Sequence, residues 1–176
     1  VILAIFAGAF LLIALQKPDT FRVARSAMID APPERIFPLI SDFREWRAWS
    51  PWEDKDPDMQ RSFGGAESGK GATYAWDGDG KVGKGRMRIV LAEPPSKVRL
   101  ALDFERPFEA HNVVEFALDP VGGATRITWT MDGPLPFVGK IMHTVFDMDS
   151  MVGKDFEAGL ANLKRAAETP PGNASV

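Results

Sequence analysis

A change in hydrophobic periodicity near Pro136 limits the folds that this 176-residue chain can adopt. Before Pro136, apolar residues alternate with polar ones in successive short segments, as in β-strands that bury one face. After it, apolar residues recur at intervals of three and four, which predicts one stripe of a long helix. The residues of this stripe are Phe137, Ile141, Val145, Met148, Val152, Phe156, Leu160 and Leu163. A sheet with one solvated face must cover its other face, and this helix is available to do so.

The alternating segments predict an antiparallel sheet with turns between consecutive strands. A first strand is expected at 21–30, and a short helix at 34–40 follows two prolines. The remaining strands are expected at 57–63, 73–76, 83–91, 97–105, 109–119 and 125–131. The fold class is therefore α+β: a curved sheet wrapped around one long helix, with an interior large enough to leave a cavity.

Two features of the closing helix require contacts with the sheet. Gly139, Gly153 and Gly159 each cost about 1 kcal/mol inside a helix, so we expect a close approach of the helix to the sheet at these positions. Asp149 lies near the apolar stripe, and a partly buried carboxylate there would need a cationic partner such as Arg86 or Arg88.

Three tryptophans, Trp46, Trp49 and Trp52, lie within seven residues. Trp46 and Trp49 are three apart and would share one face of a short helix, which Asp42 caps and Pro51 ends. Side chains this large must be buried, and so short a helix has no core of its own. Two interpretations remain open: the segment forms a lid or wall of a cavity, or its side chains fill an ordinary core.

Composition excludes several kinds of chemistry. The chain has no cysteine, which removes disulfides, thiol catalysis and thiolate metal sites. A net charge of -3, without a block of lysine or arginine, gives no electrostatic footprint for nucleic acid. The two histidines, His111 and His143, are far apart in sequence and form no metal-binding pair. We therefore expect no metal ion, no cofactor and no nucleic-acid partner.

Two motifs match ligand-binding patterns only in part. The glycine motif at 78–83 has the spacing of the dinucleotide fingerprint, but a strand follows it where the fingerprint opens a helix. The acidic motif at 54–58 has calcium-loop spacing, but Met59 occupies the position that needs glycine. We interpret the first as a hairpin turn and the second as a solvated acidic loop.

The two ends of the chain differ from the part between them. Residues 1–15 (VILAIFAGAFLLIAL) carry no polar side chain, but they are fewer than the about 20 residues that span a membrane. Because the chain begins with valine, we expect them to belong to a single, truncated membrane anchor. A secretory signal and a buried helix are the alternatives. The expected organisation is an anchor at 1–16, a linker at 17–20, one domain at 21–168 and a disordered tail at 169–176.

Four segments within residues 21–168 form a recognisable set. They are IDAPPERIFPLISDFREWRAWSPW, GKGATYAWDGDGKVGKGRMRI, TRITWTMDG and DMDSMVGKDFEAGLANLKRAAE. Together they resemble the START-like (SRPBCC, helix-grip) superfamily, and within it the polyketide cyclase/dehydrase-type branch. The resemblance implies a cavity for a hydrophobic ligand between the sheet and the long helix, with the short helices at one mouth. It does not imply cyclase chemistry, because the superfamily also includes carriers and sensors.

The resemblance and the number of large apolar side chains favour a cavity over a plain core. Small-molecule sites are generally concave and apolar, with few polar groups. The residues expected to line the cavity are Trp46, Trp49, Trp76, Met87, Phe104, Phe108, Trp129, Met131, Phe137, Met142 and Phe146.

The sequence leaves three hypotheses for function. The first is a membrane-tethered domain that binds a hydrophobic small molecule or lipid and catalyses no reaction. The second is a cyclase or dehydratase, which is weakened because Tyr74 is the only tyrosine and neither histidine has a clear orienting partner. The third is a module that binds a protein partner through the tryptophan segment, and it requires those tryptophans to be exposed.

Overall fold

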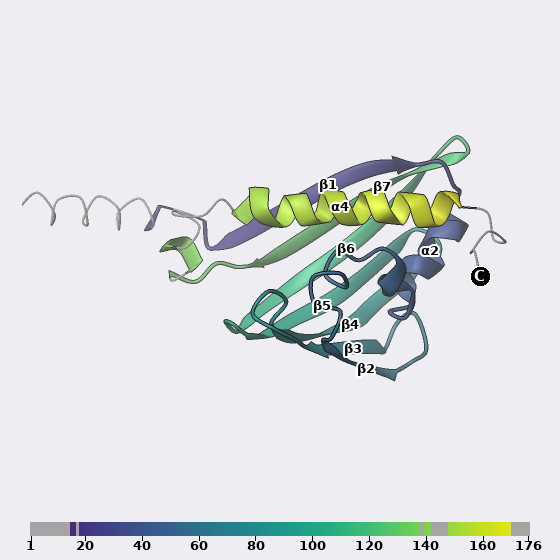
Figure 1. The fold of residues 1–176 in the computed structure, drawn as a ribbon. Coiled ribbons are helices and arrows are strands. Elements are labelled where there is room, and N and C mark those ends of the chain that lie inside the picture. The colour runs from purple at the N-terminus through teal and green to yellow at the C-terminus, as the bar shows by residue number, and fades with distance from the viewer. Residues whose placement is uncertain (1–14, 17, 138, 142–147, 170–176) are drawn as a thin grey trace, which may run out of the picture.

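The chain forms one antiparallel sheet that curves around a long C-terminal helix (Figure 1). The computed structural model describes residues 15–16, 18–137, 139–141 and 148–169. Its elements in chain order are β1 (Thr20–Ile29), α2 (Pro33–Ser41), the 3₁₀ turn η1 (Glu45–Ala48), β2 (Gln60–Gly65), β3 (Ala72–Asp77), β4 (Lys84–Glu93), β5 (Lys97–Arg106), β6 (Ala110–Val121), β7 (Ala124–Pro134) and α4 (Met148–Glu168). The strands lie in the order β1-β7-β6-β5-β4-β3-β2. The predicted sheet is confirmed, and the predicted closing helix is confirmed over α4, which begins at Met148 and not at Phe137. Residues 1–14 of the apolar segment and residues 142–147 of the predicted helix lie outside the described residues.

Each predicted strand is present, with ends that differ from the predicted ones by at most three residues. The alternation of side chains explains this agreement. In β5, for example, Val98, Leu100 and Leu102 are buried on one face, while Arg99 between them is exposed. A slip of one residue would turn the apolar side chains to solvent, so the pattern specifies both the strand and its register.

The tryptophan segment does not form the capped helix that the sequence predicts. It contains a single 3₁₀ turn without a side-chain cap, and Trp49 lies beyond its end. The indole N–H groups of Trp46 and Trp49 donate to the carbonyl oxygens of Ile40 and Leu39, at 2.9 and 2.8 Å. These bonds hold the segment against the C-terminal end of α2, which leaves no length for a full α-helical turn.

Helix α4 lies along β1 (Figure 1), and its contacts explain two of its glycines. A Cβ on Gly159 would lie 2.8 Å from the ring of Trp129, and one on Gly153 would overlap the guanidinium of Arg25. The expected close approach of the helix to the sheet is therefore confirmed at Gly153 and Gly159, whereas Gly139 precedes α4 and a Cβ there would meet Leu135 and Pro136 instead of a strand. The fully buried residues of the predicted stripe are Phe156, Leu160 and Leu163.

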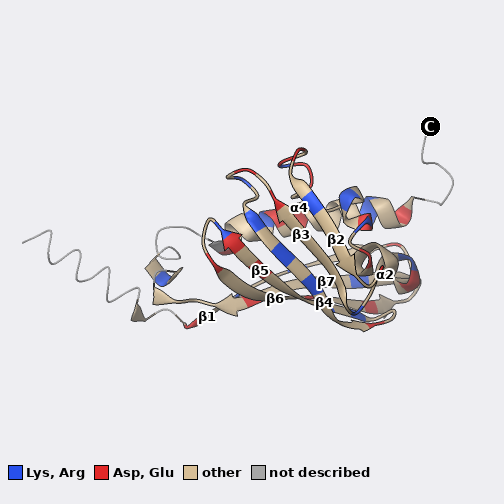
Figure 2. Cartoon of the chain, turned by 90° about the horizontal axis from the view of Figure 1, so that it is seen from below, with Lys and Arg blue, Asp and Glu red and all other residues tan. Residues whose placement is uncertain are grey.

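Charged residues of both signs lie along the strands on the outside of the sheet (Figure 2). Arg86 and Arg88 belong to this convex face, where Arg86 pairs with Asp103 at 3.2 Å. The prediction that one of these arginines pairs with Asp149 was wrong. Asp149 pairs instead with Arg25 of β1, at 3.1 Å. The reason is that α4 crosses the concave face over β1, on the opposite side of the sheet from Arg86 and Arg88.

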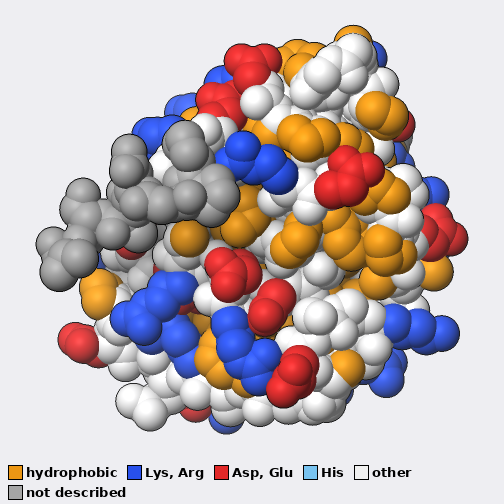
Figure 3. All heavy atoms as spheres, turned by 90° about the vertical axis from the view of Figure 1, so that its right-hand side faces the viewer, with side chains coloured by type: hydrophobic (Ala, Val, Ile, Leu, Met, Phe, Trp, Pro, Cys, Tyr) orange, Lys and Arg blue, Asp and Glu red, His pale blue; other side chains and the backbone are white. Residues whose placement is uncertain are grey.

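Antiparallel pairing places the connections at two ends of the sheet. One end holds the start of β1, the connections at 78–83 and 107–109, and the segment after β7. The glycine motif at 78–83 thus joins two strands, as predicted. Figure 3 shows the other end, where α2 and the C-terminal end of α4 lie and apolar side chains are interspersed with charged ones. None of the helices described is both long and apolar enough to cross a membrane.

Candidate ligand-binding site

Four side chains from neighbouring strands form a row across the concave face of the sheet. Backbone pairing places Tyr74 of β3 opposite Met87 of β4, and Met87 opposite Leu102 of β5. Leu102 lies in turn opposite Asn112 of β6. Paired residues share a face of the sheet, so the row presents an aromatic ring, a thioether, an isobutyl group and an amide to the interior. We call these four residues the interior row.

Burial decreases along the concave face toward the interior row and beyond it. On β5, Val98 and Leu100 are 0% exposed, Leu102 is 8% exposed, and Phe104 is only partly buried. The interior is therefore closed at Val98 and more accessible toward Phe104. Phe104 lies at the end of the sheet that holds the connections at 78–83 and 107–109.

Asn112 is the polar member of the interior row, and it is 7% exposed. Its side-chain amide makes no hydrogen bond within the part of the chain that the structure describes. A Cβ on Gly133 of β7 would overlap the amide oxygen of Asn112, so the glycine lets the amide lie against the β7 backbone. The amide is therefore available to exchange hydrogen bonds with a bound molecule that carries one polar atom.

The closed half of the interior is filled by an aromatic cluster around Trp129. This ring stacks on Phe156 of α4, with centroids 4.1 Å apart and planes 9° apart. It also contacts Phe116 and Trp49, at centroid distances of 4.8 and 5.6 Å. Within the described residues, the indole N–H of Trp129 is buried and has no hydrogen-bond partner. Close packing of this kind connects α4 to the sheet.

The structure places the predicted site residues in three groups. The buried ones face the interior and are Trp46, Trp49, Trp76, Met87, Trp129 and Met131, with Phe104 partly buried beside them. Phe108 and Phe137 are 69% and 44% exposed and do not join this wall. Phe108 lies in the β5–β6 connection, and Phe137 lies in the segment after β7, where Lys140 pairs with Asp19 at 2.6 Å. Met142 and Phe146 lie outside the described residues, so their place at the site stays a prediction.

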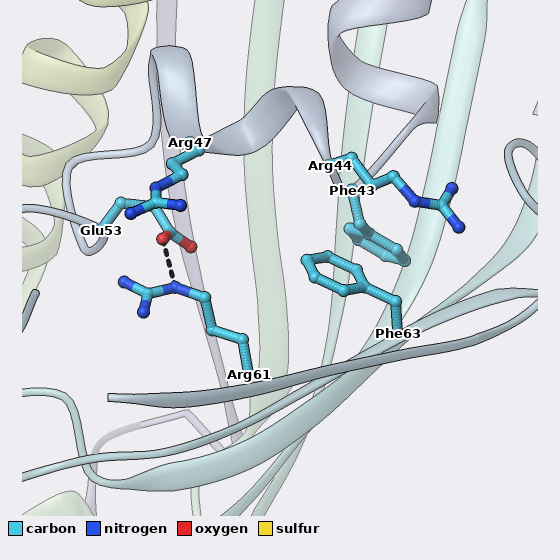
Figure 4. A pocket seen from close by; sticks show the side chains of 6 residues that line it. All are labelled: Phe43, Arg44, Arg47, Glu53, Arg61 and Phe63. Carbon is cyan, nitrogen blue, oxygen red and sulfur yellow. Dashed lines mark hydrogen bonds and ion pairs between the residues drawn. The ribbon is translucent and has the colours of Figure 1, made fainter. Parts of the chain in front are cut away.

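A second concavity of about 210 Å³ lies at the sheet edge formed by β2. Its lining residues are Phe43, Arg44, Arg47, Glu53, Arg61 and Phe63 (Figure 4). We call it the edge pocket.

Glu53 joins the edge pocket to the interior. Its carboxylate is 8% exposed, accepts a hydrogen bond from Arg61 Nε at 2.7 Å, and accepts another from the Tyr74 hydroxyl at 2.8 Å. Burial and the hydrogen bond to Glu53 raise the pKa of the Tyr74 hydroxyl, so it keeps its proton at neutral pH.

Glu53, Arg61 and Asn112 were not predicted as site residues from the sequence. Asn112 carried a detectable signal, because it occupies an inward position in an alternating strand, whereas the strand of Arg61 does not alternate. Glu53 carried none, since it lies in a connection and its partners are far away in the sequence.

Residues 20–168 match the model of the family described as polyketide cyclase / dehydrase and lipid transport. The chain belongs to this family. The resemblance that the four sequence segments indicated is thereby confirmed, and the match spans every described strand and α4. No curated protein matches the chain.

Solved structures share the fold of this polyketide cyclase / dehydrase and lipid transport domain at low sequence identity. Protein CV1439 from Chromobacterium violaceum is 15% identical with a TM-score of 0.61, and the alignment covers 88% of this chain and 100% of that one. The Aha1 dimer from Colwellia psychrerythraea is 17% identical with a TM-score of 0.60, covering 86% and 99%. The di-domain ARO/CYC BexL from the BE-7585A biosynthetic pathway is 14% identical with a TM-score of 0.63, covering 92% and 54%. At these identities the comparison concerns the fold alone.

Proposed function

We propose that this domain binds a hydrophobic small molecule between the concave face of the sheet and α4, at the interior row. The observation that carries the proposal is the unpaired amide of Asn112 beside the apolar side chains of Met87 and Leu102. A ligand with a single hydrogen-bonding group would pair with this amide. The apolar remainder of the ligand would gain about 25 cal/mol per Å² of surface that it buries. The accessible side of Phe104 is the proposed entrance.

The proposal is for binding without a chemical step. The Tyr74 hydroxyl, which belongs to the interior row, already donates a hydrogen bond to Glu53 at 2.8 Å. Its raised pKa keeps it from acting as a base at neutral pH. The third sequence hypothesis has less support, because Trp46 and Trp49 are 5% and 1% exposed and Trp52 is partly buried against the core.

A fluorescence titration with the neutral probe N-phenyl-1-naphthylamine tests the proposal on the full chain. We expect binding of one probe per chain, together with a co-purified hydrophobic molecule in native mass spectrometry. Leu102→Phe enlarges a side chain in the interior row and fills space that the probe would occupy, so we expect roughly tenfold weaker probe binding. Ala101→Phe places the same ring on the convex face of β5 and is the matched control. A folded protein that neither carries a ligand nor binds the probe would exclude this function.

We further propose that residues 1–16 tether the domain to a membrane and so raise its local concentration near lipid. Support for the tether comes from the sequence, in which residues 1–15 have no polar side chain. Extraction of membranes with sodium carbonate tests it. The full chain should stay with the membrane pellet, whereas a variant without residues 1–16 should be released. Release of both proteins would contradict the tether and would leave the binding proposal unaffected.

A further inference from the structure

The edge pocket contains more positive than negative charge. Arg44, Arg47 and Arg61 line it with a single carboxylate, that of Glu53. Glu53 is committed to Arg61, whose Nε lies 2.7 Å from one carboxylate oxygen. Arg44 lies 3.6 Å from Asp42, outside the lining. The pocket therefore keeps about one uncompensated positive charge.

Arg47 supplies this uncompensated charge. Its guanidinium makes no hydrogen bond or ion pair with any part of the chain that the structure describes. Arg61 is already engaged, because its Nε donates to Glu53, its Nη1 donates to the carbonyl oxygens of Pro57 and Met59, and its guanidinium also interacts with the Tyr74 hydroxyl. Arg47 thus presents the free N–H donors, and its guanidinium fork matches the geometry of a carboxylate or phosphate.

The opposite wall of the edge pocket is aromatic. In Figure 4, the rings of Phe43 and Phe63 lie on one side of the pocket, while Arg47, Glu53 and Arg61 lie on the other. Phe63 is 45% exposed although it is a large apolar residue on an edge strand. Exposed apolar surface next to free arginine donors fits a ligand that is apolar at one end and anionic at the other. A volume of about 210 Å³ is below the range of drug-sized sites, so the ligand is small.

We propose that the edge pocket binds a small organic anion, with its carboxylate or phosphate on Arg47, in the positive field of the neighbouring Arg61, and its flat apolar part against Phe43 and Phe63. This site is separate from the interior row. Its ligand need not be the molecule bound there, so the inference does not rest on the proposed function.

Calorimetric titration of the full chain with 2-naphthoate and 2-naphthyl phosphate tests the proposal. The uncharged 2-naphthamide has the same ring system, and inorganic phosphate has the anion without the ring. We expect one or both naphthyl anions to bind at least about tenfold more tightly than the amide or inorganic phosphate, because the site needs both parts. The preferred naphthyl anion identifies a carboxylate or a phosphate ligand. Equal binding of 2-naphthamide, or no binding of either anion, overturns the proposal.

Arginine variants locate the binding. Arg47→Gln removes a charge that no described residue pairs with, so the fold should be unaffected while the affinity for the anion falls about tenfold. Arg88→Gln removes the same charge from the convex face and is the matched control, expected to change the affinity less than about twofold. Unchanged binding in Arg47→Gln would place the anion elsewhere and refute the inference.

Discussion

Replacing Gly159 by alanine tests whether the packing of α4 on the sheet outweighs helix propensity. In an unhindered helix this change stabilises by about 1 kcal/mol, because alanine loses less backbone freedom on folding. Here the added Cβ would lie 2.8 Å from the ring of Trp129 and 3.0 Å from Cδ of Pro51. Trp129 has little room to move, since it stacks on Phe156 at 4.1 Å. Overpacking costs about 1–3 kcal/mol, so we expect a net loss of about 1 kcal/mol.

Urea denaturation followed by circular dichroism measures the free energy of unfolding for this comparison. Ala161→Gly is the matched control, because Ala161 is exposed on the same helix and its change alters propensity without overpacking. The control should lose about 1 kcal/mol from propensity alone. An increase in the free energy of unfolding for Gly159→Ala, opposite in sign to the control, would refute the reasoning. It would show that overpacking against Trp129 costs less than the gain in helix propensity.

Two further predictions concern charged groups. Glu53→Gln leaves Arg61, which is 16% exposed, without its charge partner and should lower the free energy of unfolding by roughly 3 kcal/mol. Asp149→Asn changes a carboxylate that is 60% exposed and should lower it by less than about 1 kcal/mol. Equal losses of the two variants in urea denaturation would contradict this distinction. The hydrogen bond to Asp103 at 2.7 Å raises the pKa of His111. The contribution of this pair to stability is therefore complete below the ordinary histidine pKa of about 6.5, and it is lost as the pH rises through the higher pKa of the folded state. An NMR titration should show a higher pKa for His111 than in Asp103→Asn, and identical values would refute the pairing.

The elements of this fold were predictable because their signals are local. Alternation in segments such as Lys97–Arg106 depends on which side of one strand is buried, and a short stretch of sequence records it. The stripe containing Phe156, Leu160 and Leu163 records the buried face of α4 in the same way. The tryptophan segment was predicted less well. Its conformation depends on hydrogen bonds from Trp46 and Trp49 to α2, which helical spacing does not reveal.

The candidate sites depend on contacts between distant parts of the chain. The sequence by itself determined the strands, the closing helix, the inward position of Asn112 and the family resemblance. Only the tertiary structure set Asn112 beside Leu102 and Gly133, where its amide has no hydrogen-bond partner among the described residues. It also brought Glu53 to Arg61 and Tyr74. The physical reason is that periodicity specifies which face of an element is buried, whereas strand register and the folding of connections decide which side chains meet on that face.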